Sequence, residues 1–369
     1  MTSAAAPGSV DYATWGRRLY REAFSERRPI AGSLALTHRC NLRCVHCYVQ
    51  PCRDLRELST EGWKDLVDQL ERAGCLFLVM TGGEPLLRDD FSDIYTYARK
   101  RGFLVTVFSN GTRIDAEMIS LFLRHPPHAV EISLYGTSAG TYRAVTGEAG
   151  ARDAAYGALG RLASLGIPVR AKTVVLRRNR RELASMKRRC EDLGVPFRFD
   201  TLVTPCLDGS LNPALERLDE ESLLRLDLED EKRAAEWRGI LEGDRMIPRT
   251  SVYTCGAGRT SFHVTPDGRL ALCVNDDPVH DLARSTFMDG WNGALRRRRM
   301  EELPDGHPCR GCRDQAFCGV CPPIARMETG SMLGVPRRLC RLGKVRLRAF
   351  ARAGRTSRGT RERWHEEKE

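Results

Sequence analysis

Between residues 33 and 203, short apolar runs alternate with segments in which apolar residues recur every three or four positions. The short runs are typical of buried strands, and the recurring pattern is typical of amphipathic helices. We therefore predict strands at 33–37, 76–81, 104–108, 129–134, 169–175 and 197–203. Thr60 is expected to cap the first helix, whose apolar face carries Trp63 and Leu66. Six strand–helix units predict an α/β fold with a parallel sheet, either open or rolled toward a barrel.

The remaining segments have different patterns. Residues 206–254 carry a charged helical pattern, whereas residues 255–341 hold short strands, turns and many cysteines. Residues 342–369 predict a basic helix with a highly charged end. We therefore expect the chain to have five parts: an N-terminal extension at 1–32, the strand–helix region at 33–205, and these three segments.

Polar and glycine-rich segments follow the predicted strands at four places. They are a loop with Cys40, Cys44 and Cys47, and the segments 82–85, 109–111 and 135–136. In parallel α/β folds, ligands bind on the loops that follow the carboxyl ends of the strands. We therefore expect these four segments to converge on one face of the sheet.

Composition restricts the class of protein. Of the 369 residues, 41% are hydrophobic, which is enough for a sizeable core. No apolar run approaches the length of a membrane span, and the first residues lack the order of a signal peptide, so we expect a cytoplasmic protein without a membrane partner.

The formal net charge is +11, with basic runs at 296–299 and 341–363. No aromatic residues interleave with these runs as a base-stacking surface requires, so we predict no nucleic-acid partner. Weak attraction to an acidic peptide is at least as well supported.

The chain has 14 cysteines, which in a reducing compartment are expected to be metal ligands or catalytic thiols. Three lie at 40–47 and seven between 255 and 340. Cys75 and Cys190 lie in apolar patterns and are predicted to be core residues.

The first cysteine group contains only three cysteines. Three thiolates on a four-iron cluster leave one iron open to a small molecule. Two alternatives remain open from spacing alone: a fourth ligand, with Cys52 or His46 nearest, would close the cluster, or the site would hold zinc.

The Cys40, Cys44 and Cys47 loop, ending in His46-Cys47-Tyr48, resembles the signature loop of the radical S-adenosylmethionine (SAM) enzymes. Gly82-Gly83-Glu84-Pro85 resembles the motif that meets the SAM amino group in that family. The resemblance implies that Asn110 and Ser133 lie near the SAM carboxylate and ribose, that His46 packs against adenine, and that Arg143 meets the carboxylate. It also implies a partial (β/α)6 barrel holding SAM and a [4Fe-4S] cluster.

The resemblance further implies reductive cleavage of SAM to methionine and a 5′-deoxyadenosyl radical, which takes a hydrogen atom from an unactivated carbon. A flavodoxin- or ferredoxin-type protein is the implied electron donor.

The second cysteine group contains Cys255-x12-Gly268-x4-Cys273, then Cys309-x2-Cys312-x5-Cys318-x2-Cys321, and finally Cys340. A zinc ribbon explains the paired CxxC spacings but not the three outlying cysteines. The arrangement resembles the small Cys-rich SPASM domain of radical SAM enzymes, which carries two auxiliary [4Fe-4S] clusters. The resemblance implies one cluster on Cys309, Cys312, Cys318 and Cys340, and another on Cys255, Cys273 and Cys321.

SPASM enzymes mostly act on peptides or proteins, and the stretches 133–147 and 197–203 look like peptide maturases. We therefore predict oxidative modification or cross-linking of a ribosomally synthesised precursor peptide (RiPP maturation). Because the 32 residues before the first strand are too few for a winged helix, we expect a separate leader-peptide-binding protein.

Three alternatives were weighed. Anaerobic sulfatase maturases differ at Val274 and Tyr135, haem-pathway enzymes that modify tetrapyrroles differ in the segment CGVCPPIARM, and a non-catalytic iron–sulfur carrier does not explain Gly82–Pro85. Asp208, Asp276 and Asp277 lie near cysteines, but none is assigned as a general acid or base.

Overall fold

The structure is a computed structural model that describes residues 12–49, 56–242 and 250–366. At its centre is a nine-stranded sheet with the order β6-β5-β4-β3-β2-β1-β7-β8-β9. The strands are β1 (Ala31–Thr37), β2 (Phe77–Gly82), β3 (Leu104–Ser109), β4 (Ala129–Ser133), β5 (Val169–Val174), β6 (Phe197–Asp200), β7 (Ser261–Val264), β8 (Arg269–Ala271) and β9 (His280–Asp281).

The first six strands follow chain order and pair in parallel, so all their carboxyl ends lie at one edge. β7 adds to β1 in parallel, and β8 and β9 complete the sheet with antiparallel pairing. The predicted α/β fold with six parallel strands is therefore confirmed. The sheet ends at β6 and β9, so the barrel is partial.

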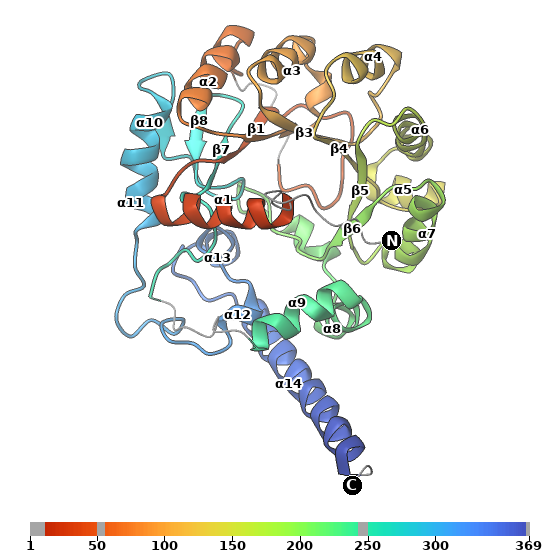
Figure 1. The fold of residues 1–369 in the computed structure, drawn as a ribbon, viewed down its shortest axis with the longest axis vertical. Helices are drawn as coiled ribbons and strands as arrows, with labels where there is room; N and C mark the ends of the chain where they lie inside the picture. Colours follow the sequence, from red (N-terminus) through yellow and green to blue (C-terminus); the bar gives the residue numbers. More distant parts are fainter. Residues whose placement is uncertain (1–11, 50–55, 243–249, 367–369) are drawn as a thin grey trace, which may run out of the picture.

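Helices cover the outer side of the curved sheet, as Figure 1 shows for α2, α3, α4, α6 and α7. The helices of the first half are α1 (Tyr12–Glu26), α2 (Thr60–Arg72), α3 (Phe91–Lys100), α4 (Ala116–Arg124), α5 (Ala139–Thr146), α6 (Ala151–Ser164) and α7 (Leu183–Asp192). The predicted apolar face of α2 is buried, with Trp63 and Leu66 at 0% and 2% exposure.

Two local expectations were wrong. Ser59, not Thr60, caps α2, because its hydroxyl accepts the Gly62 N–H while Thr60 Oγ1 donates to Asp90. The sixth strand ends at Asp200 and not near Val203, because the Asp200 carboxylate accepts the N–H groups of Thr201 and Leu202 and turns the chain. The sequence analysis also missed α1 and α5.

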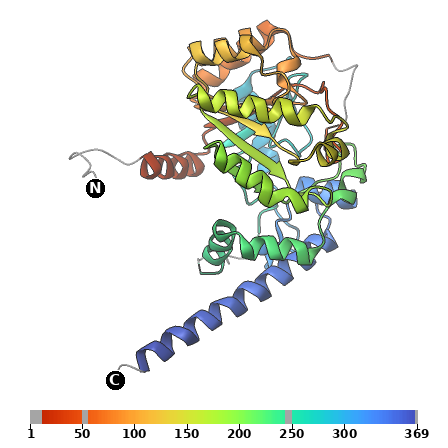
Figure 2. The ribbon, with the colours of Figure 1, turned by 90° about the vertical axis from the view of Figure 1, so that its right-hand side faces the viewer.

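The second half begins with α8 (Glu220–Glu229) and α9 (Glu231–Glu242), within the charged stretch predicted to be helical. The later helices are α10 (Phe287–Gly290), α11 (Arg296–Arg299), α12 (Gln315–Cys318), α13 (Pro322–Thr329) and α14 (Arg337–Glu366). α14 packs against α8, α9 and α12 and then extends away from the body of the molecule (Figure 2). Among the described residues, no helix has both the length and the apolar character that a membrane crossing requires.

A buried carboxylate joins α8, α9 and α14. Asp227 is fully buried and pairs with Arg233 at 2.5 Å and with Arg346 at 2.7 Å. The Arg346 guanidinium also lies 4.4 Å from the ring centre of Trp237, which stacks on Phe317. One carboxylate therefore contacts two guanidinium groups, and balances the charge of one, at the point where three helices meet.

We expect Asp227→Ala to lower the free energy of unfolding by about 3–5 kcal/mol, because it leaves the buried Arg346 without its partner. Urea unfolding of the anaerobically purified protein measures this change. Glu221→Ala is the matched control, because Glu221 is 85% exposed and its pair with Arg225 is expected to contribute at most about 1 kcal/mol. Equal destabilisation by the two variants would contradict the proposed stabilising role of Asp227.

Candidate active site

A cavity of about 570 Å³ opens at the carboxyl ends of the parallel strands. Its wall is built from the loop after β1, the turn after β2, the segment after β3, and the inward faces of β4 and β5. The residues that line it include Cys40, Cys44, Cys47, His46, Gly82, Gly83, Asn110, Ser133, Tyr135 and Lys172. The structure therefore brings together the segments that the sequence analysis expected on one face.

The three cysteines of the first loop share this cavity. Burial raises the pKa of Cys44, and the nearby Cys47 and Cys40 raise it further. Burial also raises the pKa values of Cys40 and Cys47. Thiolates in these positions need positive charge close by, which a bound metal centre supplies.

The three thiols of the first loop line one cavity. Within the described residues, no three His, Cys, Asp or Glu side chains converge on a point that holds one ion. The thiolates of an iron–sulfur cube bind different iron atoms and do not need to converge in this way. Cys52, the nearest candidate for a fourth thiol, lies outside the described residues.

Backbone hydrogen bonds hold the cysteine loop against α5. The N–H groups of Arg43 and Val45 donate to the carbonyl groups of Thr146 and Val145, both at 2.9 Å. At the far end of the loop, Leu207 N–H donates to the Tyr48 carbonyl at 2.9 Å. These contacts explain why α5, which the sequence analysis missed, matters for the site.

The turn after β2 lies directly against the end of β1. Gly83 N–H donates to the Thr37 carbonyl at 2.7 Å, and Glu84 N–H donates to the Arg39 carbonyl at 2.8 Å. A Cβ atom at Gly82 would collide with the Thr37 carbonyl oxygen, and one at Gly83 with the Arg39 carbonyl oxygen. Gly82 also has a φ of 144°, which a residue with a side chain rarely adopts. Both glycines are therefore required for this close backbone approach.

Glu84 faces the protein interior. It is fully buried, and its carboxylate accepts hydrogen bonds from Asn110 N–H at 2.7 Å, Ser109 Oγ at 2.9 Å and Leu86 N–H at 3.2 Å. Burial raises the pKa of Glu84 to about 7, although these donors stabilise its charge. The carboxylate thus fixes the segment after β3 and is not among the groups that line the cavity.

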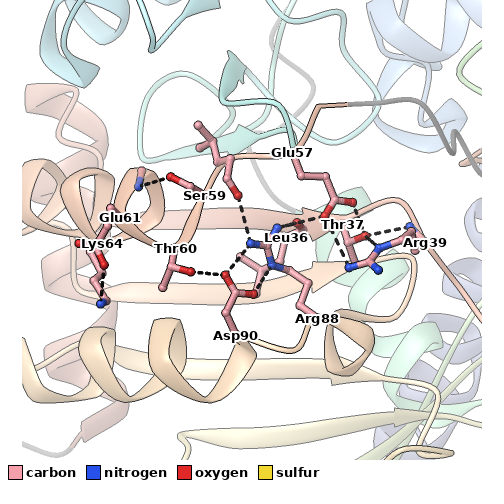
Figure 3. A network of polar contacts seen from close by, with 12 residues as sticks. Leu36, Thr37, Arg39, Glu57, Ser59, Thr60, Glu61, Lys64, Arg88 and Asp90 are labelled. Atoms are coloured by element: carbon pink, nitrogen blue, oxygen red, sulfur yellow. Dashed lines mark hydrogen bonds and ion pairs between the residues drawn. The ribbon is translucent and has the colours of Figure 1, made fainter.

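A network centred on Arg88 lies behind the glycine turn (Figure 3). The buried Arg88 guanidinium donates to the Leu36 carbonyl at 3.0 Å and to the Leu58 carbonyl at 3.1 Å. It also pairs with Glu57 at 3.1 Å and with Asp90 at 2.8 Å. Arg88 therefore ties the end of β1 to the segment that follows the cysteine loop.

His46 and Tyr135 form an aromatic wall of the cavity, with ring centres 5.1 Å apart. His46 Nδ1 is buried without a hydrogen-bond partner, and burial lowers the pKa of His46 to about 4. An unpartnered buried ring nitrogen fits a site that a polar ligand completes.

Asn110 and Ser133 also line the cavity. The Asn110 side chain donates to Asn41 Oδ1 at 2.9 Å, which orients it beside the cysteine loop. Arg143 lies on α5 with an exposed side chain and does not line the cavity. Its assignment to the SAM carboxylate stays a prediction.

The sequence analysis missed two residues at the site. Lys172 lies on β5 with its ammonium group 2.9 Å from the ring centre of Phe108 and 3.9 Å from the Glu131 carboxylate. Because residues 170, 172 and 174 alternate with the buried residues of β5, strand periodicity could have identified Lys172 as facing the interior of the barrel. Cys206 also lines the cavity, and its thiol donates to the Cys47 carbonyl at 3.4 Å. No spacing in the sequence connects Cys206 to the cysteine loop.

The later cysteines form two groups. Burial raises the pKa of Cys273 to about 12, and the nearby Cys321 and Cys255 contribute. Burial also raises the pKa of Cys318, with contributions from Cys340, Cys309 and Cys312. Cys321 therefore lies with Cys255 and Cys273, although only two residues separate it from Cys318 in the chain.

Asp276 is buried beside Cys273, where its carboxylate accepts from Tyr253 and pairs with Arg298 at 3.5 Å. Asp277 is half-exposed and pairs with Arg326 at 2.9 Å, whereas Asp208 is exposed. None of these three aspartates lines the cavity that contains Cys40, Cys44 and Cys47.

We expect Gly83→Ala to lower the free energy of unfolding by about 1–3 kcal/mol, because its Cβ would push apart the turn and the Arg39 carbonyl. Urea unfolding measures the change. Gly140→Ala, on α5 with open space around it, is expected to leave stability equal or higher. A Gly83→Ala protein as stable as the parent would contradict the close approach.

Lys172 generates a pH-dependent prediction. Burial lowers its pKa from the ordinary 10.5 to about 7, so between these values the unfolded chain binds more protons than the folded one. Stability should therefore rise with pH across this range, at up to about 1.4 kcal/mol per pH unit from this group.

Urea unfolding at pH 7 and pH 9 tests this expectation. The parent protein should gain up to about 2 kcal/mol relative to Lys172→Met over this interval. Lys187→Met removes an exposed lysine from α7 and should show the same change in unfolding free energy between pH 7 and pH 9 as the parent. If the Lys172→Met protein also showed the parent's change, the buried ammonium would not be the cause of this pH dependence.

Comparison with known proteins is consistent with the geometry. The family model of the radical SAM superfamily matches residues 34–190. The mycofactocin maturase MftC of Mycobacterium ulcerans is 31% identical over 330 residues, which cover 85% of this chain and 88% of that protein. The PqqA peptide cyclase of Gluconobacter oxydans is 27% identical over 82% of this chain and 88% of its own length. The AdoMet-dependent heme synthase of Methanosarcina barkeri is 27% identical over 81% of this chain and 92% of its own length.

Among solved structures, Streptococcus suis SuiB bound to its precursor peptide SuiA superposes with a TM-score of 0.67. The match covers 92% of this chain and 83% of SuiB at 15% sequence identity, and it therefore establishes a shared fold. The resemblance drawn from the cysteine loop and the glycine turn is thus confirmed at the level of fold and family. This chain belongs to the radical SAM superfamily, as an enzyme of its SPASM group that uses SAM and a [4Fe-4S] cluster.

Proposed function

We propose that this enzyme oxidatively modifies or cross-links a ribosomally synthesised peptide. The observation that carries the proposal is the cavity in which three thiols, the glycine turn and Lys172 meet at the mouth of the partial barrel. The similarity to a maturase and to a peptide cyclase over more than four fifths of the chain supports a peptide as the substrate.

In this proposal Cys40, Cys44 and Cys47 would hold the first cluster, beside the part of the cavity that would take SAM. When bound, the cluster and SAM supply the 5′-deoxyadenosyl radical that removes a hydrogen atom from the substrate. Gly82, Gly83, Asn110 and Ser133 line the cavity and would orient SAM there. Glu84 would act through its hydrogen bonds to Asn110 and Ser109, and the role of Arg143 toward the SAM carboxylate stays a prediction. His46, with its unpartnered Nδ1, packs beside the adenine.

Apolar side chains form part of the cavity wall. Phe108, Val174, Leu202 and Val203 contribute apolar surface around the polar groups. Exclusion of water protects a reactive species from side reactions and strengthens electrostatic interactions inside the site. The Lys172 ammonium is the cationic group of β5 at this wall, where it is placed to attract an anionic part of a substrate or of SAM.

We further propose two auxiliary [4Fe-4S] clusters, one on Cys309, Cys312, Cys318 and Cys340 and one on Cys255, Cys273 and Cys321. The proximity of the thiols within each set supports this division. An electron donor of the flavodoxin or ferredoxin type and a separate leader-peptide-binding protein are the proposed protein partners.

A second candidate substrate is a tetrapyrrole, which the similarity to the AdoMet-dependent heme synthase favours. Incubation of the reduced protein with SAM and either a porphyrin or the peptides encoded beside its gene distinguishes the two candidates. Mass change of a peptide supports the first, and loss of a porphyrin side chain supports the second.

Cys44→Ala tests the first cluster. We expect the variant to lose about four of the roughly 12 iron atoms that three clusters hold, and to form no 5′-deoxyadenosine after reduction with SAM. Iron analysis and chromatography of the products measure these effects. Cys190→Ala removes a buried core thiol instead and should keep both the iron and the SAM cleavage. Undiminished SAM cleavage by Cys44→Ala would refute the proposed ligand role of Cys44.

A further inference from the structure

An arginine-rich groove lies next to the active-site cavity. It has a volume of about 1080 Å³ and is lined by five arginines, Arg177, Arg178, Arg180, Arg217 and Arg338. They come from three separate segments: the loop after β5, the segment around the short helix η3 (Asn212–Glu216), and the start of α14. Because the loop after β5 is on the same edge of the sheet as the cysteine loop, the groove opens on the catalytic side of the barrel.

The positive charge of the groove is only partly neutralised. Arg178 pairs with Glu216 at 2.7 Å, and Arg217 pairs with Glu328 at 2.6 Å. Arg180 lies 3.8 Å from Asp219, which is 60% exposed, so this pair is weak.

Arg177 and Arg338 donate to the main-chain carbonyl groups of Leu215 and Leu218, and neither pairs with a carboxylate of the described residues. Burial and then the neighbouring Arg217 lower the pKa of Arg338, while the nearby Glu220 and Glu328 partly offset this shift.

The helix η3 connects the groove to the active-site cavity. Its first residues, Asn212 and Pro213, line the cavity, and the next residues, from Ala214 to Glu216, line the groove. Two leucines beside this connection are unusually exposed: Leu211 at 56% and Leu215 at 70%. A chain that leaves the cavity along η3 therefore meets apolar side chains first and guanidinium groups next.

We propose that this groove binds an acidic segment of the peptide substrate and so positions the residue to be modified in the cavity. This inference rests on the proposed function and names the chemistry of the part of the substrate that lies outside the reaction centre. Guanidinium groups form paired hydrogen bonds with carboxylates, so Glu and Asp side chains of a peptide suit this groove. The exposed leucines favour apolar residues among the acidic ones.

The experiment measures binding of two fluorescein-labelled peptides to the full-length protein by anisotropy. One probe alternates glutamate with leucine, and the other alternates lysine with leucine. We expect the glutamate probe to bind and the lysine probe not to bind. The affinity of the glutamate probe should fall as salt is raised, because Arg177, Arg178 and Arg180 are exposed to solvent.

Arg177→Gln combined with Arg180→Gln should weaken binding of the glutamate probe about tenfold, because each exposed pair contributes up to about 1 kcal/mol. The matched control combines Arg284→Gln with Arg297→Gln, which removes the same charge from exposed arginines outside the groove. It should bind the probe as the parent does. Arg177→Glu combined with Arg180→Glu should bind the lysine probe more tightly than the parent does.

Equal weakening by the groove and control variants would overturn the proposal, because it would assign the effect to net charge alone. A single-stranded RNA oligonucleotide that displaced the probe and bound more tightly through the same arginines would overturn it as well.

SAM cleavage without peptide separates this inference from the proposed function. Both groove variants should form 5′-deoxyadenosine as the parent does, because the groove arginines do not line the cavity. A parent protein that cleaves SAM but does not bind the glutamate probe would refute the groove proposal alone. A parent protein that cleaves no SAM would refute the enzymatic proposal, whatever the binding result.

Discussion

The active site depends on a backbone contact that is too close for any side chain. The turn after β2 donates its N–H groups to the carbonyl groups of Thr37 and Arg39, at the start of the cysteine loop. Only glycine fits at positions 82 and 83, because a Cβ atom at either would overlap a carbonyl oxygen. This contact sets the distance between the thiols and the turn and therefore the shape of the cavity between them. The buried Arg88 network holds the same two segments from behind.

Because the titratable groups of the site are buried, their protonation states depend on neighbouring charges and on bound ligands. Burial raises the pKa of Glu84 to about 7 and lowers that of Lys172 to about 7, while the three thiols are also held in their neutral forms. A metal centre and a zwitterionic ligand reverse this preference by supplying opposite charges. Glu84 illustrates a second effect, because its hydrogen bonds to Asn110 and Ser109 make it a support of the cavity wall.

Charge is organised differently outside the cavity. One buried carboxylate, Asp227, is shared by two guanidinium groups where three helices meet, whereas Arg177 and Arg338 in the groove beside η3 hydrogen-bond to main-chain carbonyl groups. The net charge of +11 includes exposed guanidinium groups of this groove, such as Arg177 and Arg180. Long-range attraction and short-range recognition of an acidic peptide can then use the same surface.

The sequence alone determined the six alternating strand–helix units, the three-cysteine loop with its glycine turn, and the resemblance to the family. Strand periodicity and cysteine spacing are local properties, and the glycine turn follows its strand in the chain, so each could be read without coordinates. Only the tertiary structure decided which side chains face the cavity. It turned Glu84 inward, left Arg143 exposed, and brought Lys172 and Cys206 to the wall. The arginine groove also required it, because its residues come from positions 177–180, 214–219 and 338 and meet only when η3 and α14 pack beside the loop after β5.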